Sequence, residues 1–186
     1  MAAPANKTIK DLNGKWVLNK KLSDSPDEGL ALQGIGFLLR KTIGLATITI
    51  TVKEYEGPPK PPSTADGTFT HIDFEQSASG LSSTKEERCL DNQPRSHSDW
   101  LFGDVEGRSR FVRLADVDDA FLSKGWDGAA DQDFVHSRGV NEKNGWEATQ
   151  VWGFQTVNGE RRFCRNILIT KGDKRAEFRF VYDFSE

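Results

Sequence analysis

Four polar residues lie among the apolar strands of this sequence in positions where they could carry out acid–base chemistry. Tyr182 and Gln150 alternate with aromatic residues, while His71 and Asp73 are two residues apart and so point to the same side of an extended strand. A phenol, an amide or an imidazole oriented by a carboxylate can exchange a proton with a bound substrate. We interpret Tyr182, Gln150, His71 and Asp73 as candidate catalytic residues, with an exposed strand face as the alternative for His71 and Asp73.

The motifs of several other chemistries are absent from the sequence. There is no Gly-x-Ser-x-Gly and no glycine-rich phosphate loop. The three histidines, His71, His97 and His136, are far apart in sequence, and Cys89 and Cys164 are too few for a disulfide framework. We therefore expect no metal site and no cofactor, with haem held by a single axial histidine as the alternative.

Composition excludes some partners. The net charge of −3 shows no basic footprint for nucleic acid, and the basic runs 108–113 and 160–165 interleave arginine with apolar residues as the outer face of a strand does. The longest apolar run, GIGFLL, is too short for a transmembrane helix, and the first residues lack the pattern of a secretory signal. A cytoplasmic protein is expected, and the sequence does not indicate an oligomeric state.

One segment near the start has helical periodicity. It follows a predicted strand over 14–22 and runs from Ser25, the expected N-cap, to Gly44, the expected stop. Gly34 and Gly36 weaken its middle, which predicts two short helices with a bend between them.

Almost everything after this segment has the period of two that strands show. Strands are predicted over 45–55, 68–76, 81–90, 95–102, 108–115 and 134–138, followed by three strands joined at Asn158-Gly159 and Gly172-Asp173, which are two-residue hairpin turns. Two insertions, about 56–67 and 116–133, read as loops. We predict an all-β fold: a single antiparallel up-and-down β-barrel of about ten strands with a helix-turn-helix lid after the first strand. Residues 1–13 form an N-terminal extension and residues 14–186 the barrel domain.

Strand alternation predicts which side chains face the interior. A ten-stranded barrel is wider than its own side chains can fill, so we expect a cavity for a hydrophobic small molecule. The residues assigned to it are mostly aromatic, with packed core as the alternative for each: Phe37, Leu38, Trp100, Phe102, Trp146, Gln150, Trp152, Phe154, Phe178, Phe180 and Tyr182.

The chain resembles the intracellular fatty-acid-binding protein family, within the lipocalin-like (calycin) barrels. The residues that carry this resemblance are GKW opening the first strand, LALQGIGFLLRKTIGLATITITV after it, and the order of the closing hairpins. The resemblance implies that the helical segment is a lid over the barrel mouth, with its apolar face toward the cavity.

The same resemblance implies a departure at the ligand anchor. The family's Arg-x-Tyr falls on Phe180-Val181-Tyr182, and its second arginine falls near Phe154, so both arginines are replaced by aromatic residues. A buried carboxylate without a paired cation is costly, so we expect a neutral ligand, polycyclic, isoprenoid-like or polyketide-like, rather than a fatty acid. Arg110 or Arg165 could supply a charge from another strand, and alternation leaves both open.

Two functions follow from these expectations. The first is a binder or carrier of a neutral hydrophobic molecule in an aromatic-lined cavity. The alternative is a cofactor-free cyclase or isomerase of a natural-product pathway, for which an aromatic wall would stabilise developing positive charge.

Overall fold

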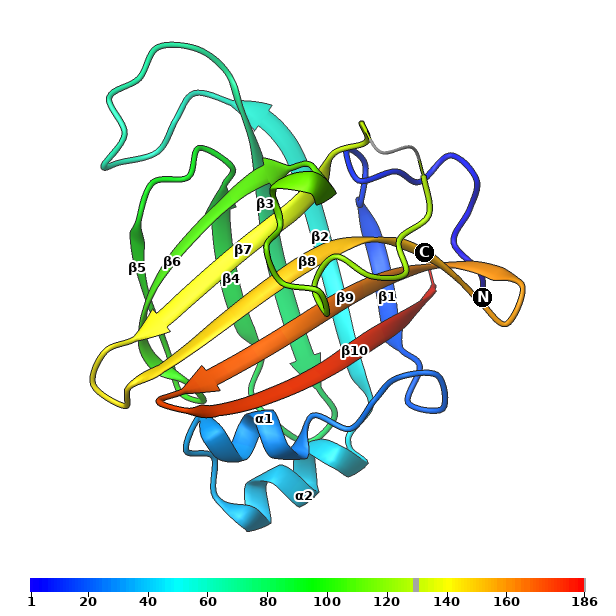
Figure 1. Cartoon of the computed structure of the whole chain (residues 1–186), viewed down its shortest axis with the longest axis vertical. Coiled ribbons are helices and arrows are strands. Elements are labelled where there is room, and N and C mark those ends of the chain that lie inside the picture. Colours follow the sequence, from blue (N-terminus) through cyan, green and yellow to red (C-terminus); the bar gives the residue numbers. More distant parts are fainter. Residues whose placement is uncertain (129–130, 186) are drawn as a thin grey trace.

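The computed structural model describes residues 1–128 and 131–185, and in this part of the chain it shows ten strands and two short α-helices (Figure 1). Residues 129, 130 and 186, which belong to the predicted barrel domain, lie outside the described residues. The elements in chain order are β1 (Gly14–Leu18), α1 (Asp27–Leu32), α2 (Phe37–Leu45), β2 (Ile48–Gly57), β3 (Phe69–Ala78), β4 (Thr84–Cys89), β5 (Arg95–Asp99), β6 (Gly103–Val112), a 3-10 turn (Leu114–Asp116), β7 (Phe134–Asn141), β8 (Trp146–Val157), β9 (Glu160–Lys171) and β10 (Lys174–Phe184).

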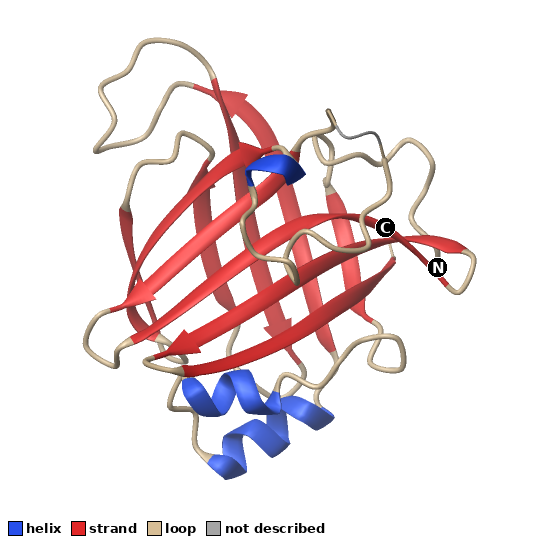
Figure 2. Ribbon diagram, viewed as in Figure 1, coloured by secondary structure: helices blue, strands red, loops and turns tan. Residues whose placement is uncertain are grey.

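All ten strands form one antiparallel sheet. Its order is β4-β3-β2-β1-β10-β9-β8-β7-β6-β5, so strands that follow each other in the chain are paired, except β4 and β5, and β1 joins β10. The sheet curls into a nearly closed barrel whose end strands are β4 and β5 (Figure 2). The predicted up-and-down barrel with a helical lid is confirmed.

The two helices lie side by side at one end of the barrel (Figure 1). Gly34, at φ 87°, provides the bend between them. The predicted helix ends were wrong: α1 begins at Asp27 with Pro26 at the N-cap position and no side-chain cap, and α2 continues through Gly44 to Leu45. Ser25 instead accepts a hydrogen bond from the N–H of Asp27 at 3.3 Å.

The closing hairpins follow the turn chemistry of the sequence. Asn158 and Gly159 have φ of 51° and 79°, and Gly172 has φ of 58°. These left-handed conformations suit glycine and asparagine, and they match the right-handed twist of the flanking strands. The predicted turns are confirmed, and they set the register of β8, β9 and β10.

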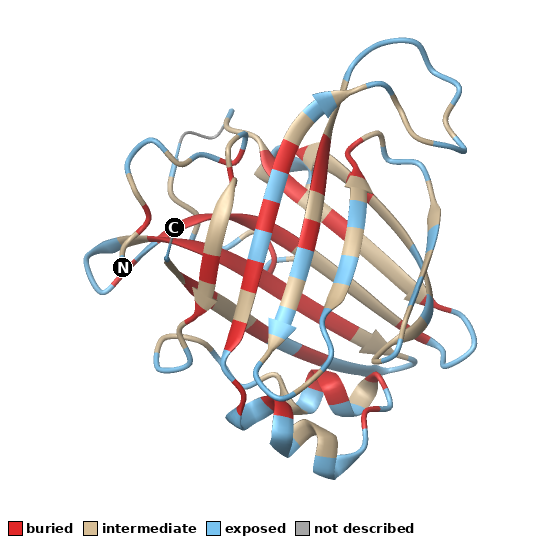
Figure 3. Ribbon diagram, turned by 180° about the vertical axis from the view of Figure 1, so that it is seen from behind, coloured by how far each residue is buried: buried red, intermediate tan, exposed pale blue. Residues whose placement is uncertain are grey.

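Alternating burial along the strands separates the inside of the barrel from the outside (Figure 3). In β2, Ile48, Ile50 and Val52 are buried, whereas Thr51 and Lys53 are exposed. The end of the barrel away from the helices is filled by a packed core. The buried members of this core include residues of the N-terminal segment, Ala3, Ile9 and Leu12, together with Trp16, Phe154 and Phe163.

The two predicted insertions both cover the barrel. Residues of the second insertion, Phe121 and Leu122, pack on the outside of the wall against Val151 and Leu168. The first insertion carries a loop that reaches both end strands: Arg95 of β5 donates to the carbonyls of Lys60 and Pro61 at 2.6 and 3.0 Å, and Lys60 pairs with Glu87 of β4 at 3.1 Å. This first insertion, about 56–67, is called the proline-rich loop below, and it bridges the two end strands β4 and β5.

None of the helices in the described part of the chain has the length and apolar character to cross a membrane.

Candidate active site

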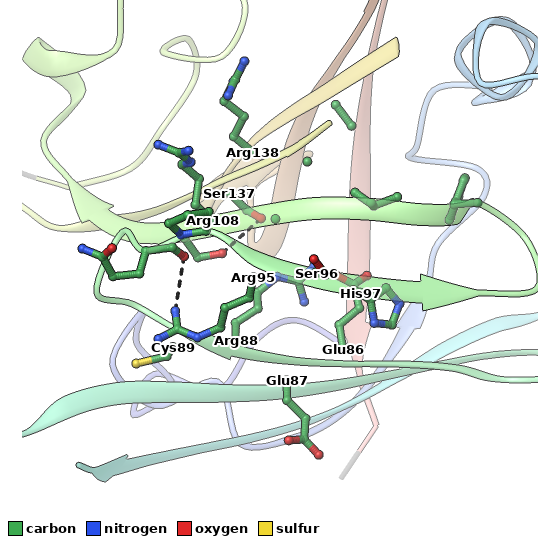
Figure 4. A pocket seen from close by; sticks show the side chains of 18 of the residues that line it. Glu86, Glu87, Arg88, Cys89, Arg95, Ser96, His97, Arg108, Ser137 and Arg138 are labelled. Atoms are coloured by element: carbon green, nitrogen blue, oxygen red, sulfur yellow. Dashed lines mark hydrogen bonds and ion pairs between the residues drawn. The ribbon is translucent and has the colours of Figure 1, made fainter. Parts of the chain in front are cut away.

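The barrel holds a cavity of about 860 Å³. It lies where β4 and β5 face each other (Figure 4). Strands β6, β7 and β8 supply much of the remaining wall, and Gln33 and residues 60–62 of the first insertion also line it. Its lining mixes apolar side chains such as Phe102 and Trp146 with polar ones such as Gln150. A smaller cavity of about 110 Å³ lies between the lid and the closing strands, and Phe102 and Gln150 line both. The volume suits a small organic molecule.

Some of the aromatic residues assigned to the cavity belong to the packed core instead. Trp152, Phe154 and Tyr182 are 0, 1 and 0 % exposed, and all three lie in the cluster around Trp16. Phe163 is at the centre of this cluster, with its ring centroid 5.2 Å from that of Trp16 and 5.4 Å from that of Tyr182. Alternation correctly placed these side chains inside the barrel. It could not distinguish interior residues that pack in the core from those that border a cavity.

Phe178 and Phe180 line the smaller cavity, together with Ile43 of the lid. Their rings contact each other with centroids 5.1 Å apart. These two residues, with Phe102, Trp146 and Trp100, are the predicted aromatic residues that border a cavity.

Two residues of the predicted binding set point to solvent, and a third is only partly enclosed. Phe37 and Leu38 are 64 and 79 % exposed, because α2 turns Ile43 rather than its first turn toward the barrel. Trp100 lies beyond the end of β5, where it is 47 % exposed and also lines the smaller cavity. Asp99 ends this strand by accepting hydrogen bonds from the N–H groups of Leu101 and Phe102 at 2.8 and 2.7 Å, so the expected strand to residue 102 was too long.

The structure does not bring His71 and Asp73 together with Tyr182. Their neighbours Ile72 and Phe74 face the interior, so His71 and Asp73 lie on the outer face of β3. His71 is nevertheless buried, because the proline-rich loop covers it: its Nε2 donates to the carbonyl of Pro58 at 2.9 Å. The predicted His71–Asp73 pair is therefore separated from the cavity by the barrel wall.

Gln150, Arg165 and Tyr182 form a hydrogen-bonded group inside the barrel. Arg165 donates to Oε1 of Gln150 from Nε at 3.1 Å and from Nη2 at 2.5 Å, and its Nη1 donates to the Tyr182 hydroxyl at 3.1 Å. Trp152 adds a third donor to the same Oε1, at 3.0 Å from Nε1. Burial raises the pKa of Tyr182, so its hydroxyl stays protonated. Because guanidinium and indole groups only donate, they fix which end of the Gln150 amide is the oxygen.

Two arginines stack on one pair of aromatic rings. The guanidinium of Arg165 lies 4.9 Å from the Phe74 ring centroid and 5.1 Å from that of Trp152, and Arg88 lies 5.3 and 4.9 Å from the same two centroids. Arg88 also forms an ion pair with Glu86. Burial lowers the pKa of Arg88, and the neighbouring charge of Arg165 acts in the same direction. This region of the interior is therefore positively charged, with cation–π contacts stabilising both guanidinium groups.

Arg165 replaces the arginine that the resemblance implied at position 180. Phe180 is the direct cross-strand partner of Arg165 between β10 and β9, so the cation has moved to the neighbouring strand while still contacting Tyr182. The choice between Arg110 and Arg165 is thereby decided. On β6 the inward residues are Ser109 and Phe111, which places Arg110 on the outer face.

The sequence did contain a signal for Arg165. It alternates with Phe163 and Ile167, both buried, in a strand bounded by the two predicted hairpin turns. Arg88 had a weaker signal, because its strand carries charged residues on both faces. Arg165 was named only as one of two possible sources of a charge, and Arg88 was not among the candidate residues.

Within residues 1–128 and 131–185, no group of three or more His, Cys, Asp or Glu side chains is arranged to hold a metal ion.

Comparison with known proteins agrees with this architecture. The crystal structure of the fluorescent protein UnaG superimposes with a TM-score of 0.54 over 94 % of this chain and 97 % of that one, at 15 % sequence identity. The fold is a fatty-acid-binding-protein-like calycin barrel. No protein-family model matches the chain.

Sequence relatives define the family. The chain is 32 % identical over 186 residues to the "probable pericyclase scpY" of Mollisia scopiformis, covering 98 % of this chain and 94 % of that protein. It is 26 % identical over 186 residues to the "pericyclase pydY" of an Acremonium species, covering 99 % and 97 %. The chain belongs to the pericyclase family.

Proposed function

We propose that this protein is a pericyclase that closes a ring in a hydrophobic natural-product precursor inside the barrel, without a cofactor. A pericyclic reaction reorganises bonds through one cyclic transition state, so the protein must fold the substrate and polarise it rather than supply redox chemistry. The observation that carries this proposal is the group of three donors converging on Oε1 of Gln150.

This arrangement gives Gln150 a defined role. Its Oε1 is already occupied by Arg165 and Trp152, and its amide Nε2 has no acceptor among the described residues, while the side chain lines both cavities. The Nε2–H group would donate to a carbonyl oxygen of the substrate. Hydrogen bonding withdraws electron density from the conjugated system and lowers the barrier to ring closure, as donors to a developing oxyanion do in other enzymes.

Tyr182 acts through Arg165 rather than on the substrate. It is fully buried, and its hydroxyl accepts from Nη1 of Arg165. Together, Tyr182 and Gln150 engage all three nitrogens of the Arg165 guanidinium. These neutral acceptors use three of the five N–H groups of Arg165, and the remaining N–H groups could donate to a carbonyl oxygen of a neutral substrate.

A second donor lies near the same aromatic pair. Nη1 of Arg88 is buried and has no hydrogen-bond partner in the described part of the chain, although Nη2 pairs with Glu86. A buried guanidinium N–H without an acceptor is costly, so a substrate oxygen would stabilise it. A substrate with carbonyl groups and an apolar chain would match the donors of Gln150 and Arg88 and the aromatic walls of Phe102, Trp146 and Phe180.

The carrier function remains the second candidate, because the cavity by itself would also hold a ligand without changing it. Native mass spectrometry of the purified protein, followed by extraction and identification of the bound molecule, gives the ligand class. Incubating the acyclic precursor of that molecule with the protein then separates the two functions: an enzyme forms the cyclic product faster than buffer does. Recovery of unchanged precursor at the buffer rate would contradict the pericyclase proposal, and binding of plain fatty acids at one to one would contradict the neutral substrate.

A further inference from the structure

A second polar pair faces the same cavity from β5. His97 and Asp99 both line the cavity or its rim, and Nε2 of His97 lies 3.2 Å from Oδ2 of Asp99. The other carboxylate oxygen, Oδ1, is held by the backbone N–H groups of Leu101 and Phe102. Asp99 is therefore fixed by the turn that ends the strand, and it orients the imidazole.

The hydrogen bond defines the tautomer of His97. A carboxylate can only accept, so Nε2 of a neutral His97 carries the proton and Nδ1 carries a free lone pair. An imidazole oriented in this way by a carboxylate is the arrangement of a general base. The side chain of His97 is 28 % exposed, so it is accessible to a molecule in the cavity.

The other two histidines are placed differently. His71 is sealed under the proline-rich loop by its bond to the carbonyl of Pro58. His136 lies on β7 between Val135, which belongs to the interior core, and Ser137, which lines the cavity, so its side chain points outward. Among the described residues, His97 is the histidine that lines the large cavity, although its sequence context gave no sign of this.

Charged side chains of β4 and β5 line the same cavity as this base. Glu86 and Arg88 of β4 point into the space between the end strands from one side, and His97 and Arg95 of β5 from the other (Figure 4). Arg95 is engaged by Asp91 and the proline-rich loop, whereas Arg88 keeps its Nη1 without a partner in the described residues. A base and a guanidinium donor therefore border one cavity.

We infer that His97 is a general base that moves a carbon-bound proton of an enolisable ketone bound in this cavity, an isomerase activity in addition to ring closure. Nδ1 takes the proton from the carbon next to the carbonyl, and the electron pair of that C–H bond becomes a C=C bond as the carbonyl becomes an enolate. Arg88 donates to the enolate oxygen. The imidazolium then returns the proton to the oxygen or to the far carbon of the conjugated system. The product is an isomer of the substrate, and no oxidant, reductant or co-reactant is consumed.

This activity can be tested with a probe that cannot undergo ring closure. 2-Tetralone is a neutral, apolar bicyclic ketone whose C1 protons exchange with deuterium through the enolate. Exchange in D₂O, followed by proton NMR, is expected to be accelerated by the wild-type protein with saturation at high ketone concentration. The variant His97→Gln is expected to lose about a hundredfold of the protein-catalysed rate, the lower end of general-base contributions. The variant His136→Gln, on the outer face, is expected to retain it.

A second variant, Asp99→Asn, distinguishes a loss of proton transfer from a loss of folding. In Asp99→Asn the amide oxygen can still hold the turn at residues 101 and 102, but its NH₂ group cannot accept from Nε2 of His97. Exchange is expected to fall while the thermal unfolding midpoint stays close to that of the wild type. Equal exchange rates in wild type and His97→Gln, including no acceleration by either, would overturn the inference. Because the probe reports only proton transfer, that result would leave the proposed ring closure untouched.

Discussion

Arg165 donates two hydrogen bonds to Oε1 of Gln150, at 3.1 Å from Nε and 2.5 Å from Nη2, across the neighbouring strands β9 and β8. The two residues are not direct cross-strand partners: Arg165 pairs with Trp152 and Gln150 with Ile167. The side chains meet diagonally on the inner face, with the Trp152 ring beside them. Because these bonds hold Oε1 of Gln150, they also fix the direction of its Nε2–H group.

Replacing Gln150 by Glu tests whether its Nε2–H group donates to the substrate. A carboxylate keeps the contact with Arg165 and turns it into an ion pair, so the fold should be retained, but it removes the N–H that faces the cavity. We expect turnover to fall by about tenfold to a thousandfold, the upper end being that of an oxyanion-hole donor. Rates of product formation and thermal unfolding measured side by side would show the loss, and unchanged turnover would exclude Gln150 as the donor.

Tyr182→Phe tests the positioning of Arg165. The variant leaves Nη1 of Arg165 without its buried acceptor, which costs about 1–3 kcal/mol of stability. Turnover should be impaired while ligand affinity stays within a few-fold, because Tyr182 is fully buried and Arg165 keeps its bonds to Gln150. Tyr55→Phe on the outer face is the matched control. Equal loss of turnover and affinity, or loss of neither, would contradict the assigned role.

Glu54 makes stability depend on pH. Burial raises the pKa of Glu54 to about 7, so the folded protein holds this proton more tightly than the unfolded chain does. Stability is therefore highest below the unfolded pKa and falls as pH rises from about 4.5 to about 7. The free energy of unfolding, measured with urea at pH 5 and pH 8, should decrease across this range.

Glu54→Gln should make that decrease smaller. The amide oxygen can replace Oε2 as the acceptor of the Leu12 N–H, which Glu54 binds at 2.8 Å, while no charge is buried above pH 7. Glu75→Gln, at an exposed position of β3, should keep the wild-type slope. An identical pH dependence in wild type and Glu54→Gln would mean that other groups cause it.

Gly29 sets how closely the lid approaches the barrel. A Cβ at this position would lie 2.5 Å from Cε1 of Phe178 and 3.1 Å from Cγ1 of Ile169. Gly29→Ala should therefore displace α1 or the Phe178 ring and lower stability by about 1–3 kcal/mol. Gly44→Ala in α2 meets nothing within 4 Å, so it should be neutral or slightly stabilising. Urea unfolding of both variants gives the comparison, and equal stabilities would show that the lid is not close-packed at Gly29.

Exposed and enclosed apolar residues of the predicted binding set should respond differently to mutation. Phe37→Ser changes a side chain that is 64 % exposed, so ligand affinity should stay within about twofold. Trp146→Leu removes an aromatic wall of the large cavity and should weaken binding several-fold. Titration of the extracted ligand, followed by isothermal calorimetry, measures both. A large effect of Phe37→Ser would place the ligand on the outside of the lid.

Much of the barrel could be predicted because its signals are local. The glycine-containing turns at 159 and 172, the period of two in the closing strands and the bend at Gly34 each depend on a few consecutive residues. Strand ends were less predictable: β5 stops at Asp99 because a side chain caps the following turn, which period alone does not show.

The sequence by itself determined the architecture and the side of the wall on which Gln150, Trp152 and Tyr182 lie, because alternation follows from the pleat of a strand. It did not determine which interior residues border open space. That depended on how the N-terminal segment and the aromatic cluster around Trp16 fill one end of the barrel. Only the tertiary structure joined Arg165 to Gln150 and Tyr182, faced Arg88 into the interior, and turned His97 rather than His71 toward the cavity. Those relationships depend on sheet closure and on loops packed over the wall, which bring together residues that are distant in the chain.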